Sequence, residues 1–154
     1  MVAAAAIIIA AAYLLLTDDV TGSEEATVRF ELADGGHLTI NCEVADTTLE
    51  RAAGLQNRDE LAIDSGMLFV YKRPQEATFV MHNVEFPLDI IFIAENGTVV
   101  NVEEAEVEEP GTSDADLVRY RSDGDVKWIV EINRGLSQQY GIGPGTRAEI
   151  VLST

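Results

Sequence analysis

The sequence predicts a mainly β protein: an antiparallel jelly-roll-like sandwich or barrel with two short helices, preceded by one N-terminal transmembrane helix. Short apolar runs recur from residue 26 onward, and clusters of Gly, Pro, Asn and Asp separate them. Only two stretches have helix-capping signals, and both are brief. A continuous apolar segment begins the chain.

Residues 1–17 are predicted to be a membrane anchor. Residues 1–16 carry no charge, and as a helix they would span roughly 24 Å at ~1.5 Å per residue, just short of the ~30 Å bilayer core. The alternative is a cleaved signal peptide, but no Lys or Arg precedes the apolar run. Residues 18–26 would then be a linker and residues 27–154 a single β domain. No basic residue near the helix sets its orientation; an anchor at the start of a chain favours an extracellular domain at the cell membrane.

Nine strands are predicted, at residues 26–32, 37–44, 66–71, 77–83, 88–94, 98–104, 117–122, 126–133 and 146–152. Asp34-Gly35-Gly36 is typical of a hairpin turn between the first two strands. Asn96-Gly97 is the favoured two-residue turn into the sixth strand. The seventh and eighth strands are expected to pair across Asp123-Gly124.

The two helices are predicted from their caps. Thr47-Thr48-Leu49-Glu50 matches a capping box, and Gly54 ends the helix after about two turns. Asn133 is expected to cap a second helix that runs through Tyr140.

The charge balance limits the possible partners. The chain has 27 acidic and 10 basic residues, for a net charge of −17. Such a surface repels phosphates, so nucleic-acid binding is excluded. A cation-binding protein and a halophilic surface are both compatible with it. The acidic residues are dispersed, with one dense run at residues 103–109, and this favours the halophilic surface.

The chain has one cysteine, Cys42, which excludes an intramolecular disulfide and a thiolate metal cluster. Period-2 alternation places Leu38, Ile40, Cys42 and Val44 on one strand face. Cys42 is therefore predicted to be a small buried apolar residue rather than a reactive thiol.

Several motifs occur in a recognisable order: residues 50–55 (ERAAGL), 66–69 (GMLF), 79–83 (FVMHN), 86–93 (FPLDIIFI), 129–135 (IVEINRG) and 141–142 (GI). Over residues 39–150 this pattern resembles the domain-of-unknown-function 192 family, and the acidic surface suggests a haloarchaeal member. The resemblance implies a compact jelly-roll-like fold and no known activity; members of the family are often secreted or membrane-anchored. The chain has His82 where the family usually has Lys or Arg. It has the acidic run where the family often has a His and a Pro/Cys-rich loop.

The candidate ligand-binding residues are Arg51, Met81, Asn83, Asp89 and Glu131. Alternation along residues 77–83 would place Met81 and Asn83 on one face and His82 on the other. Asp89 lies in a strand that is apolar on both faces, so its carboxylate needs a partner. That partner is either Arg51, in a polar pocket with Asn83, or backbone N–H groups at the turn around Pro87.

Strand 126–133 is expected to point Val126, Trp128, Val130 and Ile132 inward. Glu131 would share the outer face with Lys127 and Ile129, as a solvated or cross-strand charge.

No metal or cofactor is predicted, because Pro87 interrupts the only candidate ligand set, His82, Glu85 and Asp89. The leading hypothesis is a non-catalytic module, attached to the membrane by its N-terminal helix, that binds a small ligand or a surface protein. The alternative is an enzyme acting on surface polysaccharide or envelope material. Its carboxylates would be Asp89 and Glu131, which would have to lie about 5–9.5 Å apart.

Overall fold

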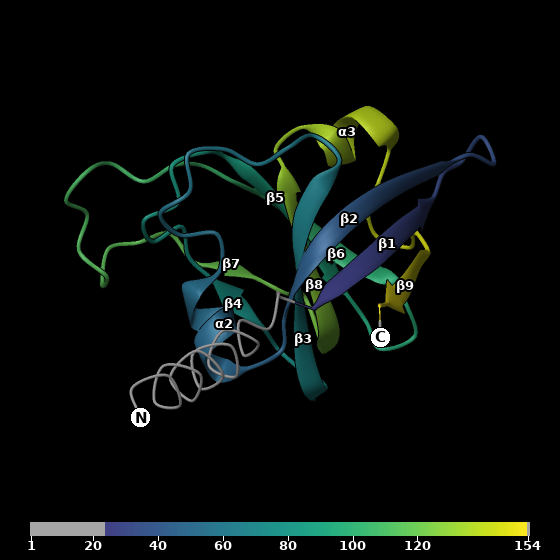
Figure 1. The fold of residues 1–154 in the computed structure, drawn as a ribbon, viewed down its shortest axis with the longest axis horizontal. Helices are drawn as coiled ribbons and strands as arrows, with labels where there is room; N and C mark the ends of the chain where they lie inside the picture. The colour runs from purple at the N-terminus through teal and green to yellow at the C-terminus, as the bar shows by residue number, and fades with distance from the viewer. Residues whose placement is uncertain (1–23, 154) are drawn as a thin grey trace, which may run out of the picture.

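The computed structural model describes residues 24–153, which form a mainly β fold (Figure 1). The strands are β1 (Glu25–Glu31), β2 (His37–Ala45), β3 (Ser65–Gln75), β4 (Thr78–Phe79), β5 (Leu88–Ile93), β6 (Val99–Ala105), β7 (Tyr120–Arg121), β8 (Val126–Asn133) and β9 (Ala148–Leu152). The helices are α2 (Thr48–Ala53) and α3 (Leu136–Tyr140). The predicted anchor, residues 1–17, lies outside the described residues. None of the helices within residues 24–153 has the length and apolar character needed to cross a membrane.

Seven strands form one curled, half-barrel sheet in the order β6-β5-β8-β3-β2-β1-β9, and β4 and β7 form a second, two-stranded sheet. The predicted all-antiparallel arrangement is wrong at one place, because β2 and β3 run parallel, with Val44 opposite Leu68. Parallel neighbours require a crossover connection, and α2 with the loop that follows it supplies one. In Figure 1, α2 lies beside the small sheet and α3 lies at one end of the large sheet.

The predicted pairing of the seventh and eighth strands is wrong. β7 pairs with β4, whereas β8 lies between β3 and β5, with Val130 opposite both Leu68 and Ile91. β8 is buried on both faces, which suits a strand in the middle of a sheet rather than one in a hairpin with a solvated face. β4 ends at Phe79, four residues before the predicted end of that strand.

Two apolar cores lie on the two faces of the large sheet. All seven strands contribute to the first core, which therefore lies inside the curl; it contains the fully buried residues Val28, Phe30, Ile40, Leu68, Ile91, Ile93, Val130 and Ile132. The buried Cys42 belongs to it, and burial raises the pKa of its thiol to about 12, as expected for an inert apolar residue. The second core lies against β4 and the end of α2; it includes Leu55, Phe69, Met81, Leu88, Ile90, Phe92 and Ile129.

Trp128 is only half-buried at the edge of the first core, and Lys127 Nζ lies 5.5 Å from its ring centroid. The inward stripe is therefore confirmed at Val130 and Ile132, but Trp128 is not a central core residue.

The two turns into β2 and β6 differ in how well they were predicted. The turn at residues 34–36 joins β1 and β2, as predicted. In the turn before β6, the Gly97 N–H donates to the Ala94 carbonyl at 2.9 Å, so the turn centres on Glu95 and Asn96, one residue earlier than predicted. Gly97 has φ +84°, and a Cβ there would lie 2.6 Å from the carbonyl oxygen of Ala148, so only glycine fits.

The same turn helps to join the two ends of the curled sheet. Thr98 forms an isolated antiparallel bridge with Arg147, and the Ala148 N–H donates to the Gly97 carbonyl at 2.8 Å. These contacts connect the start of β6 to the chain that enters β9.

One predicted helix cap is confirmed, and the prediction of the other is wrong. Thr47 and Glu50 form the predicted capping box of α2, and Gly54 ends the helix. α3 begins after Gly135 rather than at Asn133. The Asn133 side chain instead donates to the carbonyls of Leu61 and Ala62, at 2.7 and 3.1 Å, and holds the loop before β3.

Candidate functional site

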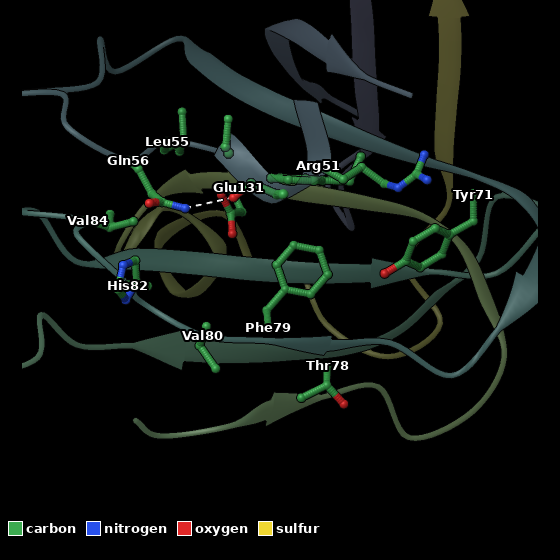
Figure 2. Close-up of a pocket in the computed structure, with 14 residues that line it drawn as sticks. Arg51, Leu55, Gln56, Tyr71, Thr78, Phe79, Val80, His82, Val84 and Glu131 are labelled. Atoms are coloured by element: carbon green, nitrogen blue, oxygen red, sulfur yellow. Dashed lines mark hydrogen bonds between the residues drawn. The ribbon is translucent and has the colours of Figure 1, made fainter. Parts of the chain in front are cut away.

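A cavity of about 250 Å³ opens on the second face of the sheet (Figure 2). Its lining comes from the end of α2 and the residues after it, from β3, from residues 78–84, and from β8. The α2 capping box fixes one side, because Thr47 and Glu50 exchange hydrogen bonds of 3.2 and 3.0 Å. The Asn57 N–H donates to the Asn83 carbonyl at 3.0 Å, which joins the chain after α2 to the segment that forms the opposite side.

Aromatic rings form much of the cavity wall. Phe69 and Phe79 meet edge to face, with centroids 4.9 Å apart and an interplanar angle of 89°. Phe79 also meets Phe92 at 5.9 Å, so the Phe79 ring is held between a ring on β3 and a ring on β5. Tyr71 extends the wall towards Arg51.

Arg51 lies at the rim, and its guanidinium points away from Glu131 and towards Tyr71 (Figure 2). Its Nη1 donates to the Val70 carbonyl at 3.1 Å and to the Asp46 carbonyl, and its guanidinium lies 5.6 Å from the Tyr71 ring centroid. Arg51 therefore lines the cavity but does not pair with Asp89.

Glu131 forms the floor of the cavity. In register it lies between Met67 of β3 and Ile90 of β5, and it is only 5% exposed. Burial raises the pKa of its carboxyl group to about 8. None of residues 24–153 donates a hydrogen bond to this carboxyl group. Figure 2 shows it between Gln56 and Phe79, facing the cavity. The prediction that Glu131 is a solvated charge is wrong, because the second core covers that face of β8.

Asp89 lies on the other face of the sheet. It is 1% exposed, and its Oδ2 accepts hydrogen bonds from the N–H groups of Gly135 and Ser137, at 3.1 and 2.8 Å. Asp89 thus does bind backbone N–H groups, but at the start of α3 rather than at the turn around Pro87. Asp89 is opposite Ile132 and Ile90 is opposite Glu131, so the two carboxylates point to opposite faces and cannot flank one glycosidic bond.

The fold and these motifs agree with the comparison to known proteins. Residues 30–150 match the model of the family described as "Uncharacterized ACR", domain of unknown function 192 (DUF192). The chain belongs to this family. None of the curated proteins matches it.

Two solved structures resemble this DUF192 chain. One, from Sinorhizobium meliloti 1021, is described as a candidate transcription regulator; it is 30% identical, with a TM-score of 0.72, and the match covers 81% of this chain and 92% of that one. The other is a protein of unknown function from Novosphingobium aromaticivorans DSM 12444; it is 33% identical, with a TM-score of 0.74, and the match covers 85% of this chain and 89% of that one.

Of the five predicted ligand-binding residues of this DUF192 protein, only Arg51 and Glu131 line the cavity. Met81 is buried in the second core. Asn83 has φ +52° and borders a separate depression beside residues 107–112. The predicted alternation fails here because β4 ends at Phe79 and the chain turns.

The two departures from the family pattern lie near each other in the structure, because His82 borders the same depression as Glu108 and Glu109 of the acidic run. His82 Nδ1 also lies 3.1 Å from Asp114 Oδ1, on the loop between β6 and β7. Within residues 24–153, no three His, Cys, Asp or Glu side chains converge as metal ligands would.

Sequence reasoning missed the aromatic wall, Phe69, Tyr71 and Phe79, and the polar rim residue Gln56. One signal was present: Glu131 is the one acidic residue of β8, and β8 has apolar residues on both faces.

Proposed function

We propose that this DUF192 chain is a non-catalytic module that binds a small ligand in the cavity above Glu131. The observation that carries the proposal is the Glu131 carboxyl group, which is buried, faces the cavity and accepts no hydrogen bond from residues 24–153. Burying a carboxyl group without a partner lowers the stability of the fold, and buried acids with raised pKa values cluster at functional sites. A ligand that supplies the missing partner explains why the group is there.

The enzymatic alternative receives less support. Its two carboxylates, Asp89 and Glu131, are on opposite faces, and Asp89 is engaged at the start of α3. The cavity has one carboxyl group among its lining residues, so it lacks the pair that glycoside hydrolysis needs.

A nucleic-acid partner is not proposed. One similar structure is described as a candidate transcription regulator. The net charge of −17 on this chain opposes contact with phosphates, because such binding depends on Lys and Arg that neutralise them.

The proposed module is anchored in the cell membrane by residues 1–17, with the domain outside the cell. The apolar, uncharged N-terminal segment supports the anchor. An exposed turn offers a test of the outward placement: Asn96 is exposed and begins the sequon Asn96-Gly97-Thr98. Intact-mass measurement of the membrane-extracted protein should show a glycan that is missing from Asn96→Asp. Protection of the domain from external protease in intact cells would contradict this placement.

The binding proposal can be tested without assuming the nature of the ligand. The full chain in detergent micelles would be screened against neutral, cationic and anionic fragments, with NMR detection of the methyl groups of Leu55, Val80 and Val84, which line the cavity. Methyl groups of Val28 and Ile40, in the first core, are the internal control. We expect some fragments to shift the methyl resonances of Leu55, Val80 and Val84 but not those of the control residues. These fragments should bind Glu131→Gln with at least tenfold lower affinity than the wild type. If no fragment does so, the proposal is wrong.

A further inference from the structure

We propose that the ligand of the Glu131 cavity is a small organic cation, a primary or secondary alkylammonium whose N–H groups bind the Glu131 carboxylate. This inference rests on the proposed function and specifies its ligand class. Three features of the site support it: a carboxyl group at the floor that accepts no hydrogen bond from residues 24–153, aromatic rings in the wall, and a strongly anionic protein around it.

A positively charged hydrogen-bond donor is the best partner for the Glu131 carboxylate at the floor of the cavity. Glu131 lies between the apolar side chains of Met67 and Ile90, and no residue from 24 to 153 donates to it. An ammonium group brings two or three N–H donors and the opposite charge in one small group. Hydrogen bonds between such ions are about twice as strong as those between neutral groups.

The wall suits the rest of such a ligand. The rings of Phe69, Tyr71 and Phe79 offer apolar contact to an alkyl chain, and aromatic faces attract cations. One wall residue already makes this contact, because the Arg51 guanidinium lies 5.6 Å from the Tyr71 ring centroid.

Among residues 24–153, few positively charged side chains could take the place of a cationic ligand at Glu131. Arg51 on α2 is bound to backbone carbonyls and points away, and Lys127 on β8 pairs with Glu95 at 3.1 Å. The titratable groups that line the cavity besides Glu131 and Arg51 are Tyr71 on β3 and His82, whose Nδ1 lies 3.1 Å from Asp114 Oδ1. The net charge of −17 attracts cations and repels anions at the mouth.

Binding of a cation must be coupled to loss of a proton. Burial raises the pKa of Glu131 to about 8, so the carboxyl group is mostly protonated at neutral pH. An alkylammonium binds the ionised form, so its association constant should rise about tenfold per pH unit up to about pH 8. A neutral ligand that accepts a hydrogen bond from protonated Glu131 should show the opposite trend.

The test uses three ligands of one shape: cyclohexylmethylammonium, cyclohexylmethanol and cyclohexanecarboxylate. Each is titrated by calorimetry into the full chain in micelles at constant high salt, at pH 6, 7 and 8, and in two buffers of different ionisation enthalpy. Glu131→Gln removes the negative charge and keeps the size of the side chain. Glu149→Gln is the matched control, because it makes the same change on the exposed face of β9.

We expect the ammonium to bind the wild type and Glu149→Gln, to release a proton, and to bind Glu131→Gln at least tenfold more weakly. Binding of the alcohol or the carboxylate that equals or exceeds that of the ammonium and depends on Glu131 would overturn the cation inference but leave ligand binding intact. Ammonium binding that is unchanged in Glu131→Gln would also overturn it. So would the absence of binding by all three ligands, whereas the fragment screen alone decides whether the cavity binds ligands.

Discussion

Asp89 and Glu131 lie on adjacent strands, each one residue from the other's cross-strand partner, yet their carboxyl groups face opposite cores. Asp89 accepts two backbone N–H groups, whereas Glu131 accepts none from the described part of the chain. The two acids should therefore have opposite effects on stability.

Glu131→Gln should stabilise the protein above neutral pH. The pKa of Glu131 is raised from 4.5 to about 8, so between these pH values the native state holds a proton that the unfolded chain has lost. The free energy of unfolding of the wild type should therefore fall as pH rises through this range, by several kcal/mol in all. In Glu131→Gln this component is absent. Urea unfolding at pH 5, 6.5 and 8.5 measures it, with Glu149→Gln as control; equal pH dependence in wild type and Glu131→Gln would contradict it.

Asp89→Ala should destabilise the fold by about 2–4 kcal/mol, because it leaves the N–H groups of Gly135 and Ser137 without an acceptor in a buried place. Asp34→Ala is the matched control: Asp34 accepts the Gly36 N–H at 2.8 Å, but in an exposed turn. Loss of this hydrogen bond in Asp34→Ala should lower the free energy of unfolding by less than about 1 kcal/mol. Equal losses in the two variants, measured by chemical unfolding, would show that the buried cap is unimportant.

Gly97→Ala should destabilise the protein more than Gly111→Ala. Both glycines have φ +84°, so the backbone strain of an alanine is the same, roughly 1–2 kcal/mol. A Cβ at residue 97 would lie 2.6 Å from the Ala148 carbonyl oxygen, whereas at residue 111 no atom of residues 24–153, the two chain neighbours aside, lies within 4 Å. We expect an additional loss of about 1–3 kcal/mol at Gly97. Thermal unfolding of the pair isolates this contact, and equal midpoints would argue against it.

High salt should raise the melting temperature. The motive is the net charge of −17, whose self-repulsion is screened by salt. Melts in 0.1 M and 3 M KCl would be compared with melts in sucrose, an excluded but uncharged solute that strengthens burial without screening. Stabilisation by KCl well beyond that by sucrose supports the halophilic surface. A midpoint that is equal or higher in low salt would exclude it.

Local signals predicted most of the elements but not their partners. The capping box at Thr47 and the alternation in β1 and β2 depend on neighbouring residues, and these were predicted correctly. The parallel pairing of β2 with β3 and the position of β8 between β3 and β5 depend on residues far apart in the chain. The pattern of neighbouring residues contains no information on the β2–β3 pairing or on the position of β8.

The site shows the same limit. Alternation in β8 placed Ile132 on an inner face and Glu131 on the opposite face, and both placements are correct. The assumption that the opposite face meets solvent was wrong, because α2, β4 and their loops cover it. Their position is a property of the tertiary fold, so the sequence alone could not show that Glu131 is buried.

The place of β8 in the sheet also has a consequence for biosynthesis. Without β8, the pair β5 and β6 has no strand that joins it to β3, β2, β1 and β9. Residues 126–133 leave the ribosome late, after seven other strands, and their pairings span long sequence separations. The nascent chain therefore stays without a complete sheet until synthesis is nearly finished. Until then the edges of β3 and β5 that pair with β8 stay open, and open strand edges of this kind are places where nascent chains associate wrongly.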